Sequence, residues 1–453
     1  MGFVRLGRKV ILACGIGLAA VSPAAAVIGT IDEVPAATLL LPYFEVDLAG
    51  GANGFTTMFS VNNAASTAVL AHVVIWSDLS VPVLDFNLYL TGYDVQTINL
   101  RDLLVGGKLP RTASAGQDPT DTVSPHGAFS QDIDFASCAG QLPSTDLPPN
   151  FLDHLQRSLT GQASPILGGL CAGRVAGDNI ARGYVTVDTV KSCTLRFPGD
   201  VGYFAPGGTG DATNQNVLWG DYFYVYPAGD AIGETLVHIE ASGLDRETSV
   251  AGQYTFYGRY VGWLASDNRE PLATQFAARF AVGGAFAGGT NLIVWRDSKV
   301  AQSAFPCPAV AGLRPSWYAL GQEAIVIFDE QENPDVPQSF PVSPQPPGAA
   351  LLPFPAEAQV VEIGVDLPVT PSFGWIFLNL NTAVAAAGAN PPEDRLAAQA
   401  WVTVVWSSGA GGAAGRRVLQ PPPPNRKVAI SHDAVKLDSA TGPIHTRPGN
   451  SPQ

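Results

Sequence analysis

Residues 55–104 alternate between apolar and polar side chains, and this pattern constrains the fold more than any other feature of the sequence. In 84–91, Leu or Phe occupies every even position, whereas Asp, Asn, Tyr and Thr occupy the odd ones. A period of two places the two sets on opposite faces of a half-buried strand. Similar patterns predict strands at 55–61, 69–76 and 95–100. Short antiparallel strands at about this spacing are typical of an immunoglobulin-like β-sandwich, so we predict an all-β fold.

Strand patterns continue along the rest of the chain. Residues 35–48 have a continuous apolar centre, interrupted by Pro42, which is typical of a strand buried on both faces. The polar side chains of the other strands are expected mostly on a solvent face. These further strands are predicted at 182–190, 221–226, 235–241, 254–263, 291–297, 323–329, 359–365, 374–380 and 398–406.

The chain is much longer than the roughly 100 residues that one sandwich needs. We therefore predict two decorated sandwich domains, at 27–230 and 231–440, with one large sandwich as the alternative. A Trp-x-Asp motif follows three aliphatic residues at Trp76 and again at Trp295, which supports two related domains. Residues 441–453 are expected to form a disordered tail.

An insertion interrupts the first predicted domain. Near 106–178, Pro, Ser, Thr, Gly and Asp replace the strand pattern. Within this insertion, leucines at helical spacing predict one helix at 150–161, with Asn150 as its N-terminal cap and Gly161 at its end.

The first 26 residues have the three parts of a secretory signal peptide: basic residues, an apolar stretch and the alanines at 24–26. We expect cleavage before Val27 and a bacterial protein that is secreted, held at the cell surface or kept in the periplasm. The apolar stretch is too short to span a bilayer, so no integral membrane segment is expected after cleavage. Cys14 leaves a lipid-anchored alternative, although the apolar stretch continues past it.

The charge of the chain argues against two classes of partner. The formal net charge is −14, and loss of three basic residues with the signal peptide would make it −17. Nucleic acids and anionic membranes bind basic patches, and the sequence contains no cluster of Lys and Arg. A cell-surface protein or a glycan stays open as the partner.

Four cysteines follow the signal peptide, and an even number in an exported protein indicates two disulfides. Three connectivities are possible. The preferred one joins Cys138 to Cys171, which would close the insertion, and Cys193 to Cys307, which would connect the two halves of the chain. No pair has the Cys-x-x-Cys spacing of a zinc or redox site.

The sequence lacks the common local motifs of catalytic sites, including G-x-S-x-G, H-E-x-x-H and G-x-x-x-x-G-K. A catalytic site assembled from distant Ser, His and Asp residues stays open. We nevertheless predict that the protein is not an enzyme and that it has no catalytic residue, no cofactor and no metal site. The six histidines are His72, His126, His154, His238, His432 and His445. His72 and His238 lie in predicted strands, where we expect them to have structural roles. His154 is expected on the polar side of the predicted helix.

An acidic loop could bind calcium. Carboxylate oxygens are the ligands that this ion prefers, although a solvated loop explains the acidic run equally well. Its acidic residues are Asp329, Glu330, Glu332 and Asp335.

An aromatic cluster could bind sugar, because ring faces next to hydrogen-bonding groups form such sites. Packing in the core is the preferred interpretation, since neighbouring residues of a strand point to opposite faces. The cluster consists of Tyr254, Tyr257, Tyr260 and Trp263, with Phe256 among them and polar residues at 267–270.

Segments 71–104, 178–200, 290–299 and 398–405 resemble those of a family of exported bacterial proteins with no assigned activity. The resemblance covers most of the chain after the signal peptide and implies no catalytic residue. More broadly, the strand pattern is similar to immunoglobulin-like sandwiches of surface and adhesive proteins. We therefore expect a secreted or cell-surface, non-enzymatic structural or adhesive protein, with a carbohydrate-binding protein or a secreted hydrolase as alternatives.

Overall fold

The computed structural model describes residues 34–112, 135–143, 145–227, 231–241, 255–261, 266–273, 275–283, 289–298, 301–307, 325–335, 354, 356–380, 399–407, 428–431 and 435–437. The predicted signal peptide, the predicted tail, His126, His432 and His445 lie outside these residues.

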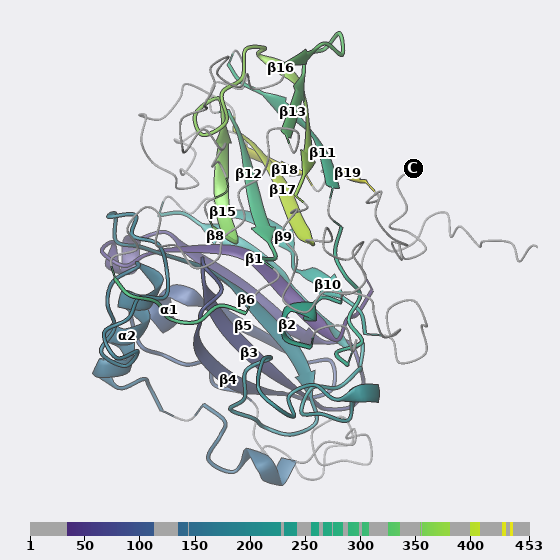
Figure 1. Ribbon diagram of the computed structural model, residues 1–453. Helices are drawn as coiled ribbons and strands as arrows, with labels where there is room; N and C mark the ends of the chain where they lie inside the picture. The colour runs from purple at the N-terminus through teal and green to yellow at the C-terminus, as the bar shows by residue number, and fades with distance from the viewer. Residues whose placement is uncertain are drawn as a thin grey trace, which may run out of the picture.

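The described chain is mostly antiparallel strand, which confirms the prediction of an all-β sandwich fold (Figure 1). Sheet I has the order β10 (Val237–Ile239), β1 (Thr38–Asp47), β6 (Ile180–Val190), β3 (Val69–Ser77) and β4 (Pro82–Leu90). Sheet II has the order β5 (Val95–Asn99), β2 (Thr56–Asn63), β8 (Asp221–Val225) and β9 (Ala231–Thr235), and β7 (Leu218–Trp219) also pairs with β2.

Two further sheets contain the later strands. Sheet III has the order β15 (Ala358–Ile363), β12 (Thr290–Arg296), β17 (Ala400–Ser407) and β18 (Val428–Ser431). Sheet IV has the order β14 (Pro334–Asp335), β13 (Ile325–Phe328), β16 (Phe373–Asn379), β11 (Gln275–Ala281) and β19 (Val435–Leu437). The immunoglobulin-like type of these sheets stays a prediction.

The predicted domain boundary at residue 230 also stays a prediction, but strand pairing bears on it. Both β9 and β10 lie beyond residue 230, and they pair with β8 and β1 respectively. Two strands that follow this position therefore belong to sheets II and I.

Strand β1 is buried along nearly its whole length, as its apolar sequence predicts. Its pairing with β6 shifts register between Leu41 and Phe44, next to Pro42. Proline cannot donate a backbone hydrogen bond to a neighbouring strand, which explains why the pairing is irregular at Pro42.

Three α-helices accompany the described strands: α1 (Leu100–Leu104), α2 (Pro149–Leu159) and α3 (Gly258–Val261). The predicted helix is confirmed as α2, and Gly161 with φ of 74° follows its end. The predicted cap is wrong, because Pro148 precedes the helix and Asn150 lies within it. None of the described helices is long and apolar enough to cross a membrane.

The predicted strand at 254–263 is wrong where the structure describes it. Residues 255–261 form a turn and α3. Gly258 donates a backbone hydrogen bond to Thr255, and Val261 donates one to Tyr257. The turn lets the neighbouring side chains of Phe256 and Tyr257 enter the same core, which two successive residues of a strand cannot do.

Two disulfides are present, as predicted, but the preferred pairing is wrong. Cys138 bonds to Cys193, and Cys171 bonds to Cys307. Cys138 and Cys193 share a small core with Leu70 and Tyr89 at the end of sheet I. The second bond is set by an antiparallel bridge in which Cys171 and Phe305 exchange backbone hydrogen bonds of 2.8 and 2.9 Å.

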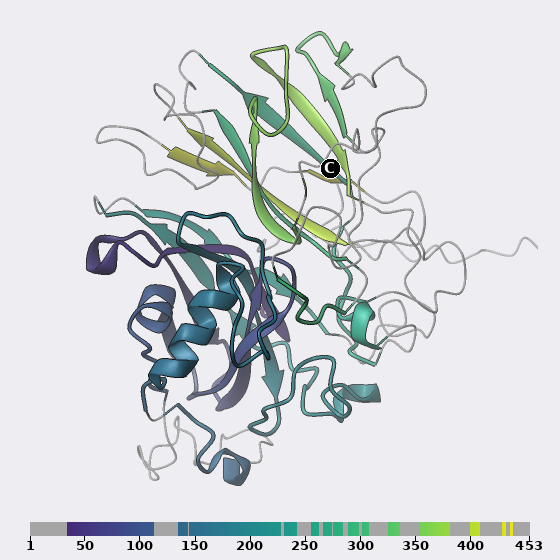
Figure 2. The same ribbon diagram turned by 60° about the vertical axis from the view of Figure 1, so that its left-hand side comes forward.

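Sheets I and II form the lower half of the molecule in Figures 1 and 2, and sheets III and IV form the upper half. Strand β12 contributes to both halves. Leu292 and Val294 lie in the core shared with sheet IV, whereas Ile293 and Trp295 lie in the large core of sheets I and II. Sheet III is therefore covered on both faces, and one of its faces packs toward the first two sheets.

Candidate functional site

One face of sheet I carries a group of buried polar side chains. Asp188 of β6 lies directly opposite Thr38 of β1 and His72 of β3, and His72 lies opposite Asn87 of β4. Cross-strand neighbours point to the same face of a sheet. We call this side of sheet I, which also holds Glu45, Arg182, Tyr184 and Thr186, the polar face.

We expect the polar side chains of the strands to lie mostly on a solvent face, and this expectation is wrong for sheet I. The side chains of Thr38, His72, Asn87 and Asp188 are all fully buried. Residues from later parts of the chain cover these side chains. The alternation of apolar and polar residues shows that a strand has two different faces, but it does not show whether solvent or protein covers the polar one.

Aromatic residues provide much of this cover. Tyr184 of the polar face stacks on Trp76, with ring centroids 5.7 Å apart, and meets the edge of Trp295 of β12 at 5.9 Å. The ring of Tyr260 in α3 also stacks on Trp76, with the centroids 6.1 Å apart. Sheet III and the segment around α3 thus both rest on the first sheet.

Asp188 is the centre of a buried cluster that joins three segments. The hydroxyl groups of Tyr203 and Tyr257 donate to Asp188 Oδ2 at 2.7 and 2.9 Å, and the Thr38 hydroxyl donates to Oδ1. Arg269 Nη2 lies 3.7 Å from Asp188 Oδ1. Burial, together with the negative charge of Asp188, raises the pKa of both tyrosines well above its usual value, so both remain protonated donors.

Arg269 is fully buried and fastens the segment that follows α3 to the lower half. Its Nε donates to the Thr38 hydroxyl at 2.9 Å, and its Nη2 donates to the Thr213 carbonyl at 2.9 Å. Asp267 nearby accepts from the Thr255 hydroxyl and from the Tyr257 backbone N–H. Burial raises the pKa of Asp267 to about 6.

A second buried cluster joins the two halves of the molecule. Arg259 Nη1 lies 2.9 Å from both carboxylate oxygens of Glu357, and its Nη2 lies 2.9 Å from Asp297 Oδ1. We call these three residues the interface cluster. Their side chains are almost completely buried. One guanidinium thus faces two carboxylates, and burial beside Asp297 raises the pKa of Glu357 to about 7.

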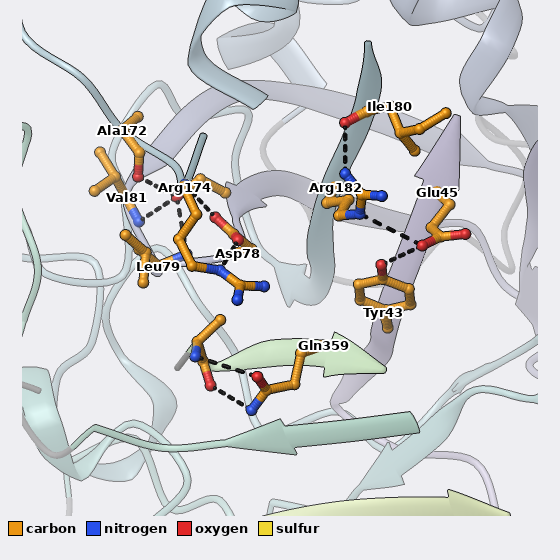
Figure 3. A network of polar contacts seen from close by, with 12 residues as sticks. Tyr43, Glu45, Asp78, Leu79, Val81, Ala172, Arg174, Ile180, Arg182 and Gln359 are labelled. Atoms are coloured by element: carbon orange, nitrogen blue, oxygen red, sulfur yellow. Dashed lines mark hydrogen bonds and ion pairs between the residues drawn. The ribbon is translucent and has the colours of Figure 1, made fainter. Parts of the chain in front are cut away.

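Backbone hydrogen bonds tie the interface cluster to sheet I. Glu357 donates its N–H to the Asp78 carbonyl at 2.9 Å, and its carbonyl accepts from Arg296. The Asp78 carboxylate accepts from Arg174 Nε at 2.6 Å and from the Arg174 N–H at 3.0 Å (Figure 3). Asp78 and Asp297 are the acids of the two Trp-x-Asp motifs, and both lie at this junction.

A third charged group lies on β1 and β6. Arg182 Nε is 3.5 Å from Glu45 Oε1, and its Nη2 is 2.6 Å from Asp178 Oδ2. The Tyr43 hydroxyl donates to Glu45 at 2.5 Å (Figure 3). Gln359 of β15, labelled in the same view, exchanges two hydrogen bonds with the backbone of Ala356.

The described histidines are held by internal contacts. His72 Nδ1 is 3.1 Å from Asn87 Oδ1, and burial lowers the His72 pKa despite Asp85. His154 is buried rather than on the polar side of α2, so that expectation is wrong. Its Nδ1 hydrogen bonds to the Ser164 hydroxyl at 2.7 Å, and Ser164 is fully buried too. His238 accepts a hydrogen bond from the Gly220 N–H.

The acidic run uses its first carboxylate to shape its own loop. Asp329 Oδ1 accepts from the N–H groups of Gln331 and Asn333, and its Oδ2 accepts from the Asn333 side chain. These hydrogen bonds from Asn333 hold the Asp329 pKa below its usual value. Glu330 and Glu332 are exposed, and the backbone of Asp335 pairs with Ile327 in β14. Across the described ranges, no group of three or more His, Cys, Asp or Glu residues could hold a metal ion.

The aromatic cluster proposed as a sugar site is packed inside the protein where it is described. Tyr257 is buried and bonded to Asp188, and Tyr260 is half-buried against Trp76. The polar residues that follow, Asp267 and Arg269, are also buried and hydrogen bond to Tyr257 and to Thr38 respectively. Tyr254 and Trp263 lie outside the described residues.

A carboxylate with a raised pKa is often a catalytic acid or base, but structural ion pairs shift pKa values as well. The two oxygens of Glu357 are both held by Arg259, and the side chain is sealed from solvent. The arrangement is suited to fastening the two halves together. The sequence patterns did not mark Arg259 or Glu357, and they indicated Arg269 only as one of the polar residues beside a possible sugar site. The repeated Trp-x-Asp motif was the local signal that marked the junction.

No protein-family model, no curated protein and no solved structure matches this chain.

Substitution of Arg259 tests the interface cluster. We expect Arg259→Gln to lower the free energy of unfolding by about 3–5 kcal/mol, because it leaves two buried carboxylates without their cation. The control is Arg157→Gln, which removes an exposed ion pair with Asp153 and should cost about 0.5 kcal/mol or less. Urea unfolding followed by tryptophan fluorescence measures both, and equal losses would contradict the assignment.

The pH dependence of stability tests the protonation of Glu357. A carboxyl whose pKa is about 7 in the folded state keeps a proton that the unfolded chain releases near its usual pKa. Stability from this group is therefore full below about pH 4.3 and is lost as the pH rises toward 7, by at most about 1.4 kcal/mol per unit.

We expect Glu357→Gln to flatten this decline, because glutamine does not titrate. Urea unfolding between these pH values measures the slope for the parent chain, for Glu357→Gln and for Glu330→Gln, which changes an exposed loop residue. Parallel slopes for all three proteins would show that Glu357 does not carry the effect.

Proposed function

We propose that this chain is a secreted or cell-surface, non-enzymatic protein with a structural or adhesive role, built from immunoglobulin-like sandwiches. The observation that carries the proposal is the pairing of buried acidic and basic side chains with one another between the layers of the protein. Arg259 and Arg269 hold Asp297, Glu357 and Asp188 inside the protein, where they join its layers. A large rigid body with its charges committed internally suits a role in contact or support.

The two disulfides support the extracellular part of the proposal, since such bonds persist in oxidising compartments. Cys171–Cys307 links segments 136 residues apart and joins the insertion to the chain that follows β12. The signal-peptide pattern of the first 26 residues supports export independently.

The geometry favours this proposal over a hydrolase. A nucleophile must reach its substrate, and both described serines that hydrogen bond to a histidine, Ser158 and Ser164, are fully buried beside His154. The raised pKa of Glu357 belongs to a carboxyl enclosed by Arg259 and by the N–H of Ser298.

Export and catalytic assays test the proposal together. We expect the exported protein to begin at Val27 in N-terminal sequencing and to turn over none of a panel of esterase, glycosidase and protease substrates. A lipid-modified start at Cys14 would contradict the proposed processing. A reproducible activity that is lost on substitution of His72, His126 or His238 would overturn the non-enzymatic role and identify a base.

A further inference from the structure

The outer face of sheet II, on the side away from sheet I, carries exposed aromatic residues. Along β7 and β8 the buried residues Leu218, Gly220, Tyr222 and Tyr224 alternate with residues that point outward. Two of the outward residues are strongly exposed: Trp219 at 42% and Phe223 at 39%. Exposed aromatic residues that recur along one face of a sheet mark a binding surface more often than scattered ones do.

Strand pairing fixes the positions of these rings. Trp219 lies opposite Asn62 of β2, and Phe223 lies opposite Met58. Asn62 and Met58 are four residues apart, so the two rings stand about 14 Å apart along the sheet. Val95 of β5, also exposed, lies on the far side of Asn62 from Trp219.

A polar ladder crosses the interval between the two rings. Asn62 Nδ2 donates to the Ser60 hydroxyl at 3.0 Å, and that hydroxyl donates to Asp221 Oδ1 at 2.6 Å. Asp221 is half-buried, so its carboxylate is still open to a ligand hydroxyl. Asn62 Oδ1 is buried and has no hydrogen-bond partner among the described residues, an arrangement that a native protein usually avoids unless a further group completes it.

The charge of the outer face argues against anionic ligands. The five strands of sheet II contain two charged residues, Asp221 and Glu234, and no Lys, Arg or His. Glu234 lies opposite Tyr222 and therefore points to the inner face, so Asp221 is the charged residue of these strands on the outer face. A face with one carboxylate and no cation on its strands repels anionic chains, including nucleic acids and acidic polysaccharides. It remains compatible with a neutral ligand that combines apolar C–H faces with hydroxyl groups.

We infer that the outer face of sheet II binds a neutral oligosaccharide. Trp219 and Phe223 stack on the C–H faces of sugar rings, and Asp221 accepts hydrogen bonds from hydroxyl groups between them. The separation of the two rings exceeds the width of one sugar ring, so the ligand is an extended chain and not a monosaccharide. The inference rests on the proposed adhesive function and gives it a ligand class, at a place other than the aromatic cluster around Tyr257.

Calorimetric titration of the full exported chain with cellohexaose and chitohexaose tests this inference, with hexagalacturonate as the anionic counterpart. The chitohexaose used is the fully N-acetylated form, which carries no charge. We expect at least one of the two neutral hexasaccharides to bind and hexagalacturonate not to bind. Trp219→Ala and Phe223→Ala should each weaken binding by about tenfold or more, because each removes one stacking ring. Asp221→Asn should weaken binding less, because the amide keeps one acceptor.

The matched control is Phe373→Ala, since Phe373 of β16 has a similar exposure of 41% and lies in sheet IV. Its binding should equal that of the parent chain. Absence of neutral-sugar binding, preference for hexagalacturonate, or loss of binding in Phe373→Ala alone would overturn the inference. A dimer in light scattering that Trp219→Ala dissociates, without any sugar binding, would assign the face to a second copy and also overturn it. These outcomes leave the export and turnover assays of the proposed function unaffected, so the two can fail separately.

Discussion

Burial of charged side chains between sheet I, sheet III and the segment around α3 is the constraint on which the rest of the structure depends. An unpaired charge inside a protein costs several kcal/mol, so each buried acid needs a partner when the face is covered. Arg269 supplies one for Asp188, Arg259 supplies one for Asp297 and Glu357, and Arg174 supplies one for Asp78. Buried ion pairs add little net stability. They do fix the position of sheet III and the segment around α3, because any other placement leaves charges unmatched.

The burial of these charged side chains also determines which sheet faces remain exposed and could contact a partner. Sheet I is covered on both sides and sheet III is covered on both sides, so neither can offer a face to a partner. Sheet II keeps its outer face, where Trp219 and Phe223 are exposed. The buried carboxylates Asp188, Asp297 and Glu357 are paired with arginines at the junction between the layers.

Local patterns predicted most strands, because period-two alternation depends only on a strand and a core. The continuous apolar run of β1 and the alternation in β4 both lie where the pattern placed them. The pattern could not show that Asn87 and Asp188 face a second layer, since that depends on residues about 70 or more positions away, such as Tyr257 and Arg269. Disulfide pairing failed for the same reason: the bridge between Cys171 and Phe305 that brings Cys307 close has no local signal.

Hydroxyl-radical footprinting of the native protein tests most directly whether the polar face is covered. Tyr184 lies on that face, Trp295 lies on the sheet above it, and Trp219 provides an exposed reference in the same chain. If the polar face is covered, Tyr184 and Trp295 are protected as strongly as Trp76 of the core, while Trp219 is oxidised rapidly. Oxidation of Tyr184 and Trp295 at a rate close to that of Trp219 would show that the two halves do not cover this face.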